Sequence, residues 1–214
     1  MNDNPRYPAL VFDWLTPIYD VFAKVFLPEE QFKRELIIRA HIAPGHKVLD
    51  FGAGSGTLAI LLKQHQPDAQ IIALDGDPHI LAIARGKASS ANVQVTFDVG
   101  NVAAMPYRND SFDRVLSSLL TSLLSREVKP LAVQESYRVL RSGGELYIAD
   151  FGKPHTRWGR WVAPLMRRFE PIVDNLDGRL PFLLCEAGFQ NVQEICHYAT
   201  FFGTLSILMG RKSA

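Results

Sequence analysis

The apolar positions of the chain follow two different periods. Short apolar runs predict five strands, near residues 47–51, 70–75, 93–98, 112–118 and 144–151. A period of three to four residues predicts helices between them, near residues 56–66, 77–89 and 127–140. Strands that alternate with helices form βαβ units, so we expect a mostly parallel sheet with helices on both faces and right-handed crossovers.

The first 44 residues have a pattern of their own. A helical period runs from about residue 15 to residue 42, and Pro28 should divide it into two helices. Glu29 and Glu30 suit the first turn of the second helix, because carboxylates stabilise the positive end of a helix dipole. We therefore expect residues 1–44 to form a helical cap on a core that spans residues 45–214.

The end of the chain departs from simple alternation. Residues 152–180 contain three prolines and short helical pieces, which indicates a lid or insertion. A short helix should follow over residues 181–187 and end at Gly188. Two closing runs, near 192–198 and 201–209, predict an antiparallel pair at the sheet edge.

A glycine-rich loop lies at the centre of this arrangement. The run VLDFGAGSGTLAILL (residues 48–62) places Gly52, Gly54 and Gly56 between a predicted strand and a predicted helix. Glycine adopts positive φ and leaves room for a close ligand. Asp75 lies about 20 residues further on, at the end of the next strand, where a carboxylate can accept hydrogen bonds from ribose hydroxyls. The pattern indicates a cofactor that contains a nucleoside, held at the carboxyl end of the sheet.

Three interpretations of this loop compete. A tight turn without a ligand would not account for the placement of Asp75. A dinucleotide site expects G-x-G-x-x-G, but Thr57 stands at the last of those positions. Binding of S-adenosylmethionine (SAM) would use Asp50, whose carboxylate precedes the loop and can lie near the positively charged end of that ligand. We favour SAM.

Four motifs in sequence resemble those of class I SAM-dependent methyltransferases over residues 45–210. They are the strand and glycine loop 48–56, Asp75, the segments 105–107 and 111–113, and the segment 137–145. The resemblance implies a Rossmann-like α/β fold, with a seven-stranded sheet of order 3-2-1-4-5-7-6 in which strand 7 is antiparallel. It also implies SAM as cofactor and S-adenosylhomocysteine (SAH) as product.

Within that family the segments 149–154 and 186–192 are similar to those of ubiquinone/menaquinone C-methyltransferases. The region before residue 45 is comparably similar to phospholipid N-methyltransferases. The resemblance therefore implies a small-molecule methyl acceptor that is quinone-like, aromatic or lipid.

The resemblance also assigns cofactor-binding residues. They are Tyr19, Asp50, Gly52, Ala53, Gly54, Gly56, Asp75, Gly76, Asn101, Val102, Ser117 and Ser118. Asn101 stands where the family carries an Asp that accepts a hydrogen bond from the adenine amino group, and its side-chain oxygen can accept the same bond. If Asn101 points to solvent, Asp98 is the substitute.

Three residues are candidates for a general base, which methyl transfer needs only if the acceptor must lose a proton. His155 follows the fifth strand, and Tyr19 and Asp150 are its rivals. No spacing of His, Cys or carboxylates predicts a metal site. Because no base is obvious, a SAM-binding regulatory protein without turnover is an alternative, and a nicotinamide-dependent oxidoreductase is a third.

The segment 153–169 combines five basic residues with Trp158 and Trp161 and has no acidic residue. It reads as a solvated helix face, as a lid over the substrate, or as a weak peripheral contact with a membrane. Glu170, Asp174 and Asp177 follow at once and would weaken attraction to a membrane. Apolar residues that suit a lid over a flat or lipid-like acceptor are Phe12, Trp14, Tyr19, Phe22, Trp158, Trp161 and Phe169.

Composition narrows the remaining classes. The net charge of +1 gives no reason to expect a nucleic-acid substrate. The two cysteines lie in apolar contexts and should be buried free thiols, which fits a reducing compartment. With no signal peptide or apolar span evident, we expect a cytoplasmic protein. The sequence leaves its oligomeric state open.

Overall fold

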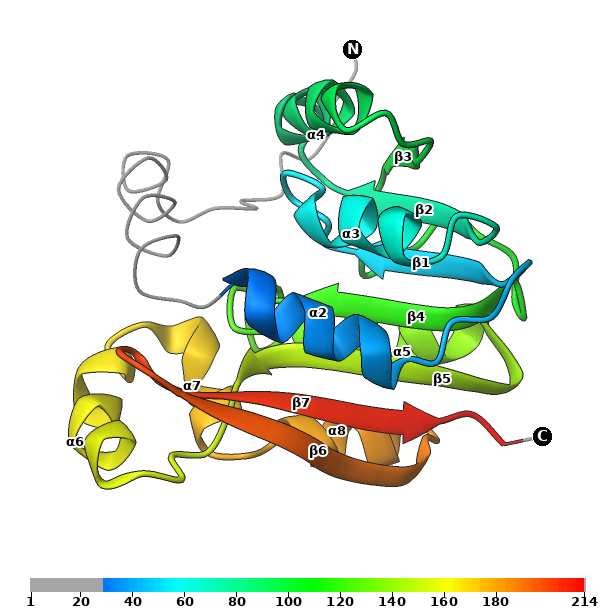
Figure 1. Cartoon of the computed structure of the whole chain (residues 1–214). Coiled ribbons are helices and arrows are strands. Elements are labelled where there is room, and N and C mark those ends of the chain that lie inside the picture. Colours follow the sequence, from blue (N-terminus) through cyan, green and yellow to red (C-terminus); the bar gives the residue numbers. More distant parts are fainter. Residues whose placement is uncertain (1–28, 214) are drawn as a thin grey trace, which may run out of the picture.

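A seven-stranded sheet forms the centre of the computed structural model, which describes residues 29–213 (Figure 1). The strands are β1 (Lys47–Phe51), β2 (Gln70–Asp75), β3 (Thr96–Val99), β4 (Phe112–Ser118), β5 (Leu140–Phe151), β6 (Gln190–Thr200) and β7 (Gly203–Arg211). Their order is β3-β2-β1-β4-β5-β7-β6. Strands β1 to β5 are parallel, and β7 is antiparallel to β5 and to β6. The predicted fold and strand order are confirmed.

Seven helices of the described chain join and cover these strands. They are α2 (Glu29–Arg39), α3 (Thr57–His65), α4 (Pro78–Ser90), α5 (Val128–Val139), α6 (Arg157–Met166), α7 (Glu170–Leu176) and α8 (Leu180–Glu186). Helix α2 begins directly after Pro28, as predicted. The earlier part of the predicted cap, with Phe12, Trp14, Tyr19 and Phe22, lies outside the described residues.

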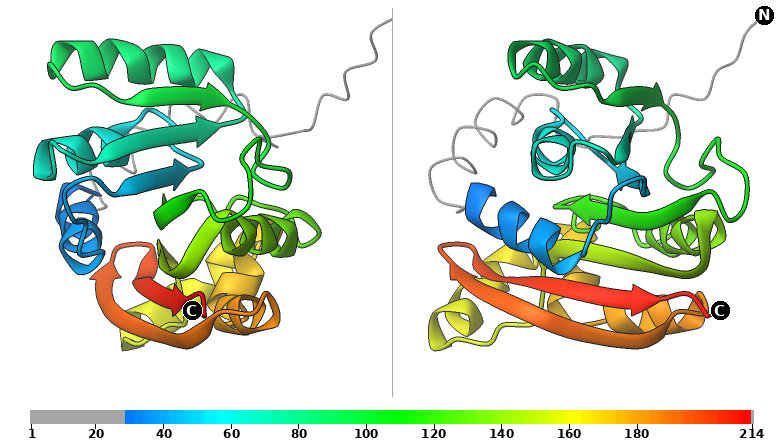
Figure 2. Two further views of the ribbon diagram at one scale, coloured as in Figure 1. Left: turned by 90° about the vertical axis from the view of Figure 1, so that its right-hand side faces the viewer. Right: turned by 45° about the vertical axis from the view of Figure 1, so that its right-hand side comes forward.

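Each face of the sheet has its own apolar layer. Helices α2 and α3 cover one face and α5 and α8 the other (Figure 2). Phe32 and Leu58 belong to the buried cluster on the first face, and Val133 and Leu184 to that on the second. Burial of such side chains contributes about 1.5–3 kcal/mol each, and this packing fixes the strands whose ends carry the site.

Three expectations need correction. Strand β3 begins at Thr96 rather than near residue 93, because Asn92 adopts a left-handed φ of 52° and the Val93 N–H still donates to the Ala88 carbonyl at the end of α4. Strand β5 extends back to Leu140 instead of beginning near residue 144. Both cysteines are free, but neither is buried as predicted: Cys185 is exposed and Cys196 is half-buried.

The parallel strands all end at one edge of the sheet. In Figure 1 this edge lies on the left, where α6, α7 and the turn between β6 and β7 also lie. In parallel α/β sheets, ligands bind beyond the carboxyl ends of the strands. No helix among residues 29–213 is long and apolar enough to cross a bilayer.

Candidate active site

The loop between β1 and α3 is shaped by close contacts that only glycine tolerates. Gly52 has a φ of 69°, and a Cβ there would lie 2.5 Å from Cδ2 of Leu120. Gly56 has a φ of 75°, and a Cβ there would lie 2.8 Å from the Cβ of Ala84 in α4. Gly52 and Gly56 therefore let the chain turn and also let neighbouring residues pack closely against the loop. Among the described residues, a Cβ at Gly54 would meet only Ile80, at 3.8 Å, so residues 29–213 leave this side of the loop open.

Several N–H groups of the loop are already engaged within the chain. The Gly52 and Ala53 N–H groups donate to the Leu74 carbonyl at 2.8 and 3.0 Å, and the Gly56 N–H donates to the Ala53 carbonyl. These residues lie where the sequence predicts a cofactor. Their bonded amides serve to hold the loop against β2, so the side chains around the loop must supply much of the recognition.

Asp75 holds the loop from the end of β2. Its Oδ2 accepts a hydrogen bond from the Gly54 N–H at 2.8 Å, and its Oδ1 accepts one from the Asp77 N–H at 3.0 Å. The carboxylate is only partly buried. A carboxylate has about four lone-pair positions, so Asp75 keeps acceptor capacity for the hydroxyls of a ribose. Gly76, also assigned to the cofactor, follows it in an exposed position.

Asp50 is the unusual group of the site. It is 1% exposed, and neither carboxylate oxygen has a hydrogen-bond partner among the described residues. Burial raises the pKa of Asp50 to about 7, with added repulsion from Asp75 and against the attraction of the Lys33 ammonium and the Ala59 N–H. A buried carboxylate without a well-formed hydrogen bond is costly. Such a group is suited to a cationic ligand that would pair with it.

Asn101 and Val102 follow β3 at the same edge. The Oδ1 of Asn101 accepts a hydrogen bond from the Ala103 N–H at 2.9 Å, which fixes the side chain against its own turn. The amide oxygen keeps a second lone pair. The predicted substitute, Asp98, accepts a hydrogen bond from the Tyr107 hydroxyl at 2.9 Å. Both candidate adenine partners are therefore present and already oriented by the chain.

Ser117 and Ser118 end β4, next to β1. Ser117 is fully buried, and its hydroxyl donates to the Phe51 carbonyl at 2.9 Å, so it ties the two strands together. Ser118 is partly buried. Leu119 follows with a φ of 57°, a strained conformation for a leucine. This bend is followed by Leu120, whose side chain lies against Gly52.

Asp150 belongs to a buried polar network at the end of β5. Its Oδ2 accepts hydrogen bonds from the Thr121 hydroxyl at 2.7 Å and the Ser122 N–H at 3.0 Å, and its Oδ1 accepts one from the Phe151 N–H. Burial raises the pKa of Asp150, although these bonds oppose the shift. Three donors already occupy the carboxylate, so it orients the turn after β4.

The network continues into α7 and α5. Thr121 accepts a hydrogen bond from Asn175 Nδ2 at 2.9 Å, and Asn175 Oδ1 accepts one from the buried Lys129 ammonium at 2.9 Å. Lys129 also donates to the Pro171 carbonyl, and burial lowers its pKa. The network thus joins β5, α5 and α7 behind the cofactor edge.

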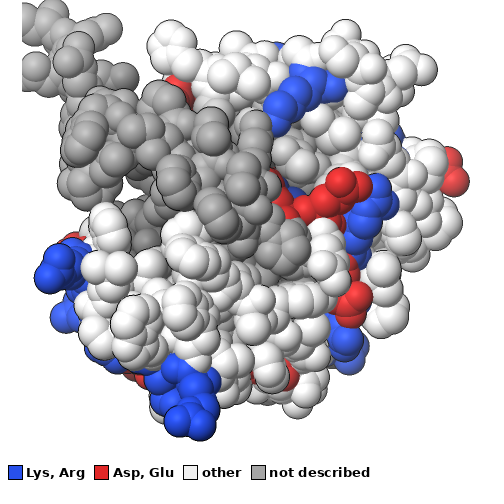
Figure 3. Space-filling view, turned by 60° about the vertical axis from the view of Figure 1, so that its left-hand side comes forward, with Lys and Arg blue, Asp and Glu red and all other residues white. Residues whose placement is uncertain are grey.

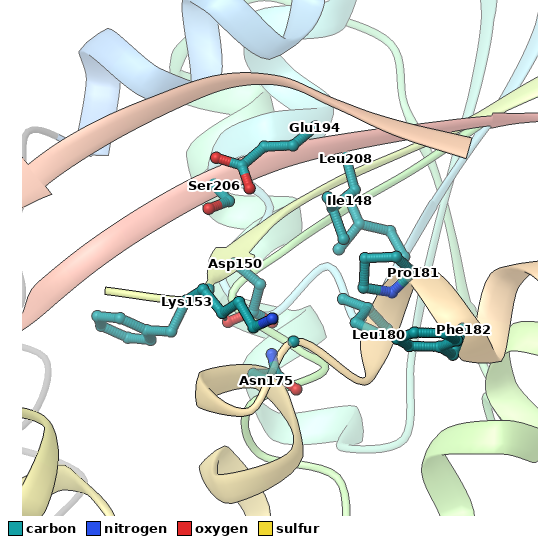
Figure 4. A pocket seen from close by; sticks show the side chains of 13 residues that line it. Ile148, Asp150, Lys153, Asn175, Leu180, Pro181, Phe182, Glu194, Ser206 and Leu208 are labelled. Carbon is teal, nitrogen blue, oxygen red and sulfur yellow. Dashed lines mark hydrogen bonds between the residues drawn. The ribbon is translucent and has the colours of Figure 1, made fainter. Parts of the chain in front are cut away.

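A cavity of about 230 Å³ opens beside Asp150 (Figure 4). Strands β5, β6 and β7 form one wall, and α7 and α8 form the other. Its lining is largely apolar, with Ile148, Leu180, Pro181, Phe182 and Leu208 beside Asp150, Lys153, Asn175, Glu194 and Ser206. The Ser206 hydroxyl is buried and has no partner among the described residues.

His155 lies at the far edge of the sheet rather than beside the glycine loop. Its Nε2 lies 2.9 Å from Oε1 of Glu194, and its ring stacks on His197 with centroids 4.2 Å apart. Both partners belong to β6, four strands from β1. At about 4.8 Å per strand this edge is roughly 19 Å from the loop. The structure brings Asp50, Asp75 and Asn101 to one edge but does not bring His155 to them. Tyr19 lies outside the described residues.

His155, Glu194 and His197 form a cluster of possible metal ligands, which the sequence did not predict. Their candidate ligand atoms lie within 4.8 Å of one another. The two rings are nearly parallel, at 9°. Ligand lone pairs lie in the ring planes, so one ion at about 2.1 Å from both nitrogens would lie well outside those planes. The cluster in this form does not have the geometry of a metal centre.

Two features of the site were missed from the sequence. Lys33 is buried and pairs with Glu29 at 2.5 Å, and its charge opposes the rise in the pKa of Asp50. It follows Phe32 and shares a helical stripe with Leu36 and Ile37, a signal that was available. The Thr121–Asn175–Lys129 network joins residues far apart in the chain, and no local pattern marks it.

Residues 48–144 match a family model described as a methyltransferase domain. That range contains β1 to β4, the glycine loop, Asp50, Asp75 and Asn101. The carboxylate of Asp50, buried beside this loop without a hydrogen-bond partner among the described residues, is suited to pair with a cationic ligand. The chain belongs to the class I SAM-dependent methyltransferases. The remaining comparisons agree with this assignment.

Two curated relatives share moderate identity with this methyltransferase. A demethylmenaquinone methyltransferase of Thermus thermophilus is 31% identical over 146 residues, which are 67% of this chain and 66% of that protein. The ubiquinone/menaquinone biosynthesis C-methyltransferase UbiE of Xanthomonas oryzae is 30% identical over 146 residues, 67% of this chain and 53% of that protein. The chain therefore spans about half to two thirds of the length of these relatives.

Solved structures share the fold of this methyltransferase at lower identity. The YcgJ protein of Bacillus subtilis has a TM-score of 0.68 and 19% identity over 86% of this chain and 99% of that chain. The [4+2]-cyclase SpnF has a TM-score of 0.71 and 18% identity over 86% of this chain and 82% of that chain. These likenesses establish the architecture, and the chemistry must be argued from the site.

The described residues fit SAM, the cofactor of the family. Its amino and sulfonium groups are cationic, and Asp50 offers a buried carboxylate with both oxygens unpaired. Asp75 can accept from the ribose hydroxyls, and Asn101 or Asp98 from the adenine amino group. Gly54 leaves the loop open on one side. The cationic groups, the ribose and the adenine amino group of SAM could thus each meet a side chain of matching chemistry at one edge of the sheet.

Proposed function

We propose that this methyltransferase moves the methyl group of SAM to a quinone-like small molecule, with SAH as the second product. The observation that carries the cofactor half is the buried Asp50, whose two oxygens have no partner among the described residues. The acceptor half is supported by relatives at 30–31% identity that are named for quinone biosynthesis. We place this activity in the cytoplasm, as the sequence led us to expect.

The chain's contribution to the reaction is mainly alignment. SAM brings its own leaving group, so the protein must hold nucleophile, methyl carbon and sulfur in line and exclude water. Asp75 and Asp50 would hold the cofactor. The Asp150–Thr121 bond would fix the turn that carries Leu120 against the glycine loop. We infer that residues 152–180, seen as α6 and α7, act as the lid over the acceptor.

Methyl transfer to a ring carbon of a quinol also calls for a base. The ring carbon of a hydroquinone becomes nucleophilic when a ring hydroxyl is deprotonated. His155, Tyr19 and Asp150 stay predictions for that role. Among the described candidates, Asp150 lies at the cofactor end of β5 but has three donors, and His155 is paired with Glu194.

A SAM-binding protein without turnover is the second candidate. It is favoured by the hydrogen-bonding of the two described base candidates: Asp150 accepts from three donors, and His155 is paired with Glu194. A nicotinamide-dependent oxidoreductase is less well supported, because Thr57 replaces the third glycine of its motif.

A labelled-methyl assay separates these candidates. The full chain is incubated with methyl-labelled SAM and a short-chain demethylated naphthoquinol, and product and SAH are measured by mass spectrometry. We expect equal amounts of methylated product and SAH, with both lost in Asp75→Ala and kept in Asp68→Ala, a change at an exposed carboxylate. Tight SAM binding without product from quinol, lipid or aromatic acceptors would instead support the regulatory protein.

A further inference from the structure

Helix α6 is apolar on two opposite faces. Its inner face consists of Gly159, Val162 and Ala163, which are buried, and the helix packs on β7. Its outer face carries Trp158, Trp161 and Leu165, at the spacing of one helical stripe. Trp161 is 75% exposed and Leu165 is 58% exposed. Core packing of α6 needs only the inner face, so the outer stripe calls for a separate explanation.

The outer stripe continues onto a neighbouring element. The Trp158 indole N–H donates to the Phe201 carbonyl at 2.9 Å, and the two rings lie 5.9 Å apart. Trp158 also stacks on Trp161, with centroids 5.4 Å apart. Phe201 lies in the turn between β6 and β7 and is itself exposed. We call Trp158, Trp161, Leu165 and Phe201 the α6 patch.

Basic side chains surround the α6 patch. Arg157, Arg160 and Arg168 are exposed, and no acidic residue occurs between residues 153 and 169. Figure 3 turns this end of the molecule forward and shows a broad uncharged surface below the grey atoms, with Lys and Arg at its left and lower margins. Tryptophan and arginine around an apolar stripe are typical of a lipid–water interface.

The acidic residues after α6 weaken this surface less than the sequence indicated. Asp174 is buried and faces Arg126 and Arg179, at 3.1 and 3.5 Å. Asp177 pairs with Arg167 at 2.5 Å. The charges of Asp174 and Asp177 are thus compensated within the fold. Glu170 is exposed and offsets part of the positive charge that Arg157, Arg160 and Arg168 present at the surface.

We infer that the α6 patch docks this methyltransferase on an anionic lipid surface, with Trp161 and Leu165 entering the interface and the arginines meeting lipid phosphates. The patch lies at the same end of the sheet as the cofactor loop (Figure 1). A lipid-soluble acceptor would then leave the bilayer at this end of the sheet, on the side of β6 and β7. The inference goes beyond the proposed acceptor, since lipid binding requires neither SAM nor a quinone.

Vesicle co-sedimentation of the full chain tests this inference. We expect binding to phosphatidylcholine vesicles that contain phosphatidylglycerol and much weaker binding to phosphatidylcholine alone. The double variant Trp161→Ala, Leu165→Ala should bind about tenfold more weakly, and Arg160→Glu with Arg168→Glu should weaken binding by about tenfold or more.

Two matched controls keep the test specific. Ile83→Ala removes an apolar side chain that is 58% exposed, as Leu165 is, but on α4. Arg108→Glu reverses an exposed charge elsewhere. Both should bind vesicles as the parent does. All variants should retain SAH binding, which shows that they fold and keeps this test apart from that of the proposed function.

Three results would overturn the inference. They are no preference of the parent for anionic vesicles, equal binding by patch and control variants, or a dimer in light scattering that only the patch variants dissociate. The last would assign the α6 patch to a second copy of the chain.

Discussion

At the scale of single residues, the site is organised around a carboxylate that the ligand-free fold destabilises. The pKa of Asp50 is raised from 3.8 to about 7, chiefly by burial. A raised carboxyl pKa means that the folded state binds the proton more tightly than the unfolded state does. Asp50 therefore does not lower the free energy of unfolding below about pH 4, where it is protonated in both states. As pH rises from about 4 to 7, the free energy of unfolding falls by about 4 kcal/mol because of this group.

Replacing Asp50 should separate stability from binding. In Asp50→Asn no buried charge forms, so we expect the ligand-free variant to be more stable than the parent at pH 8 by roughly 2 kcal/mol. Its affinity for SAM should fall by about tenfold or more, because charge-assisted bonds are lost. Urea unfolding and calorimetric titration measure the two effects, and a variant that is less stable at pH 8 would contradict this account.

Cofactor affinity should also depend on pH. SAM pairs with ionised Asp50, and a group with a pKa of about 7 is mostly protonated at pH 6. We expect SAM to bind about tenfold more weakly at pH 6 than at pH 8. Asp50→Asn is the control and should lose this dependence. Equal parent affinities at the two pH values would exclude Asp50 as the partner of the cation.

At the scale of elements, the glycine loop packs closely against the neighbouring helix α4. Gly56 and Gly45 have nearly equal φ values, 75° and 79°. A Cβ at Gly56 would lie 2.8 Å from Ala84, whereas a Cβ at Gly45 would meet no atom of residues 29–213 within 4 Å. Comparing the two glycines therefore separates the effect of the steric contact from the effect of positive φ.

Alanine substitutions at these two glycines should differ in cost. Gly45→Ala carries only the strain of positive φ, about 1 kcal/mol. Gly56→Ala adds overpacking between α3 and α4, so we expect its free energy of unfolding to fall by about 2–4 kcal/mol. Urea unfolding of both variants tests this, and equal losses would mean that the contact with Ala84 relaxes freely.

The network at the end of β5 should likewise be measurable. Thr121→Val removes a hydroxyl that donates to Asp150 and accepts from Asn175, so it should cost about 1–3 kcal/mol. It also removes a bond that lowers the pKa of Asp150, so the loss should be larger at pH 8 than at pH 5. Ser206→Ala removes a buried hydroxyl without a partner and should be nearly neutral. Similar losses in both variants would refute a role for the network.

At the scale of the whole molecule, the sequence predicted more of the cofactor end than of the acceptor end. The βαβ periods and the loop around Gly54 are local patterns, and from them the sheet was predicted correctly, as were the strands that carry Asp50 and Asp75. Contacts between distant residues have no such signature. The network from Lys129 to Asp150 and the pairing of His155 with Glu194 depend on how β5, α7 and β6 pack, so only the structure reveals them.

Direct binding of the cofactor tests the central claim. Isothermal titration of the full chain with SAM and with SAH should show one site for each, lost in Asp75→Ala, which removes the acceptor of the Gly54 N–H, and unchanged in Asp68→Ala. Absence of binding of both ligands by the intact protein would contradict the account.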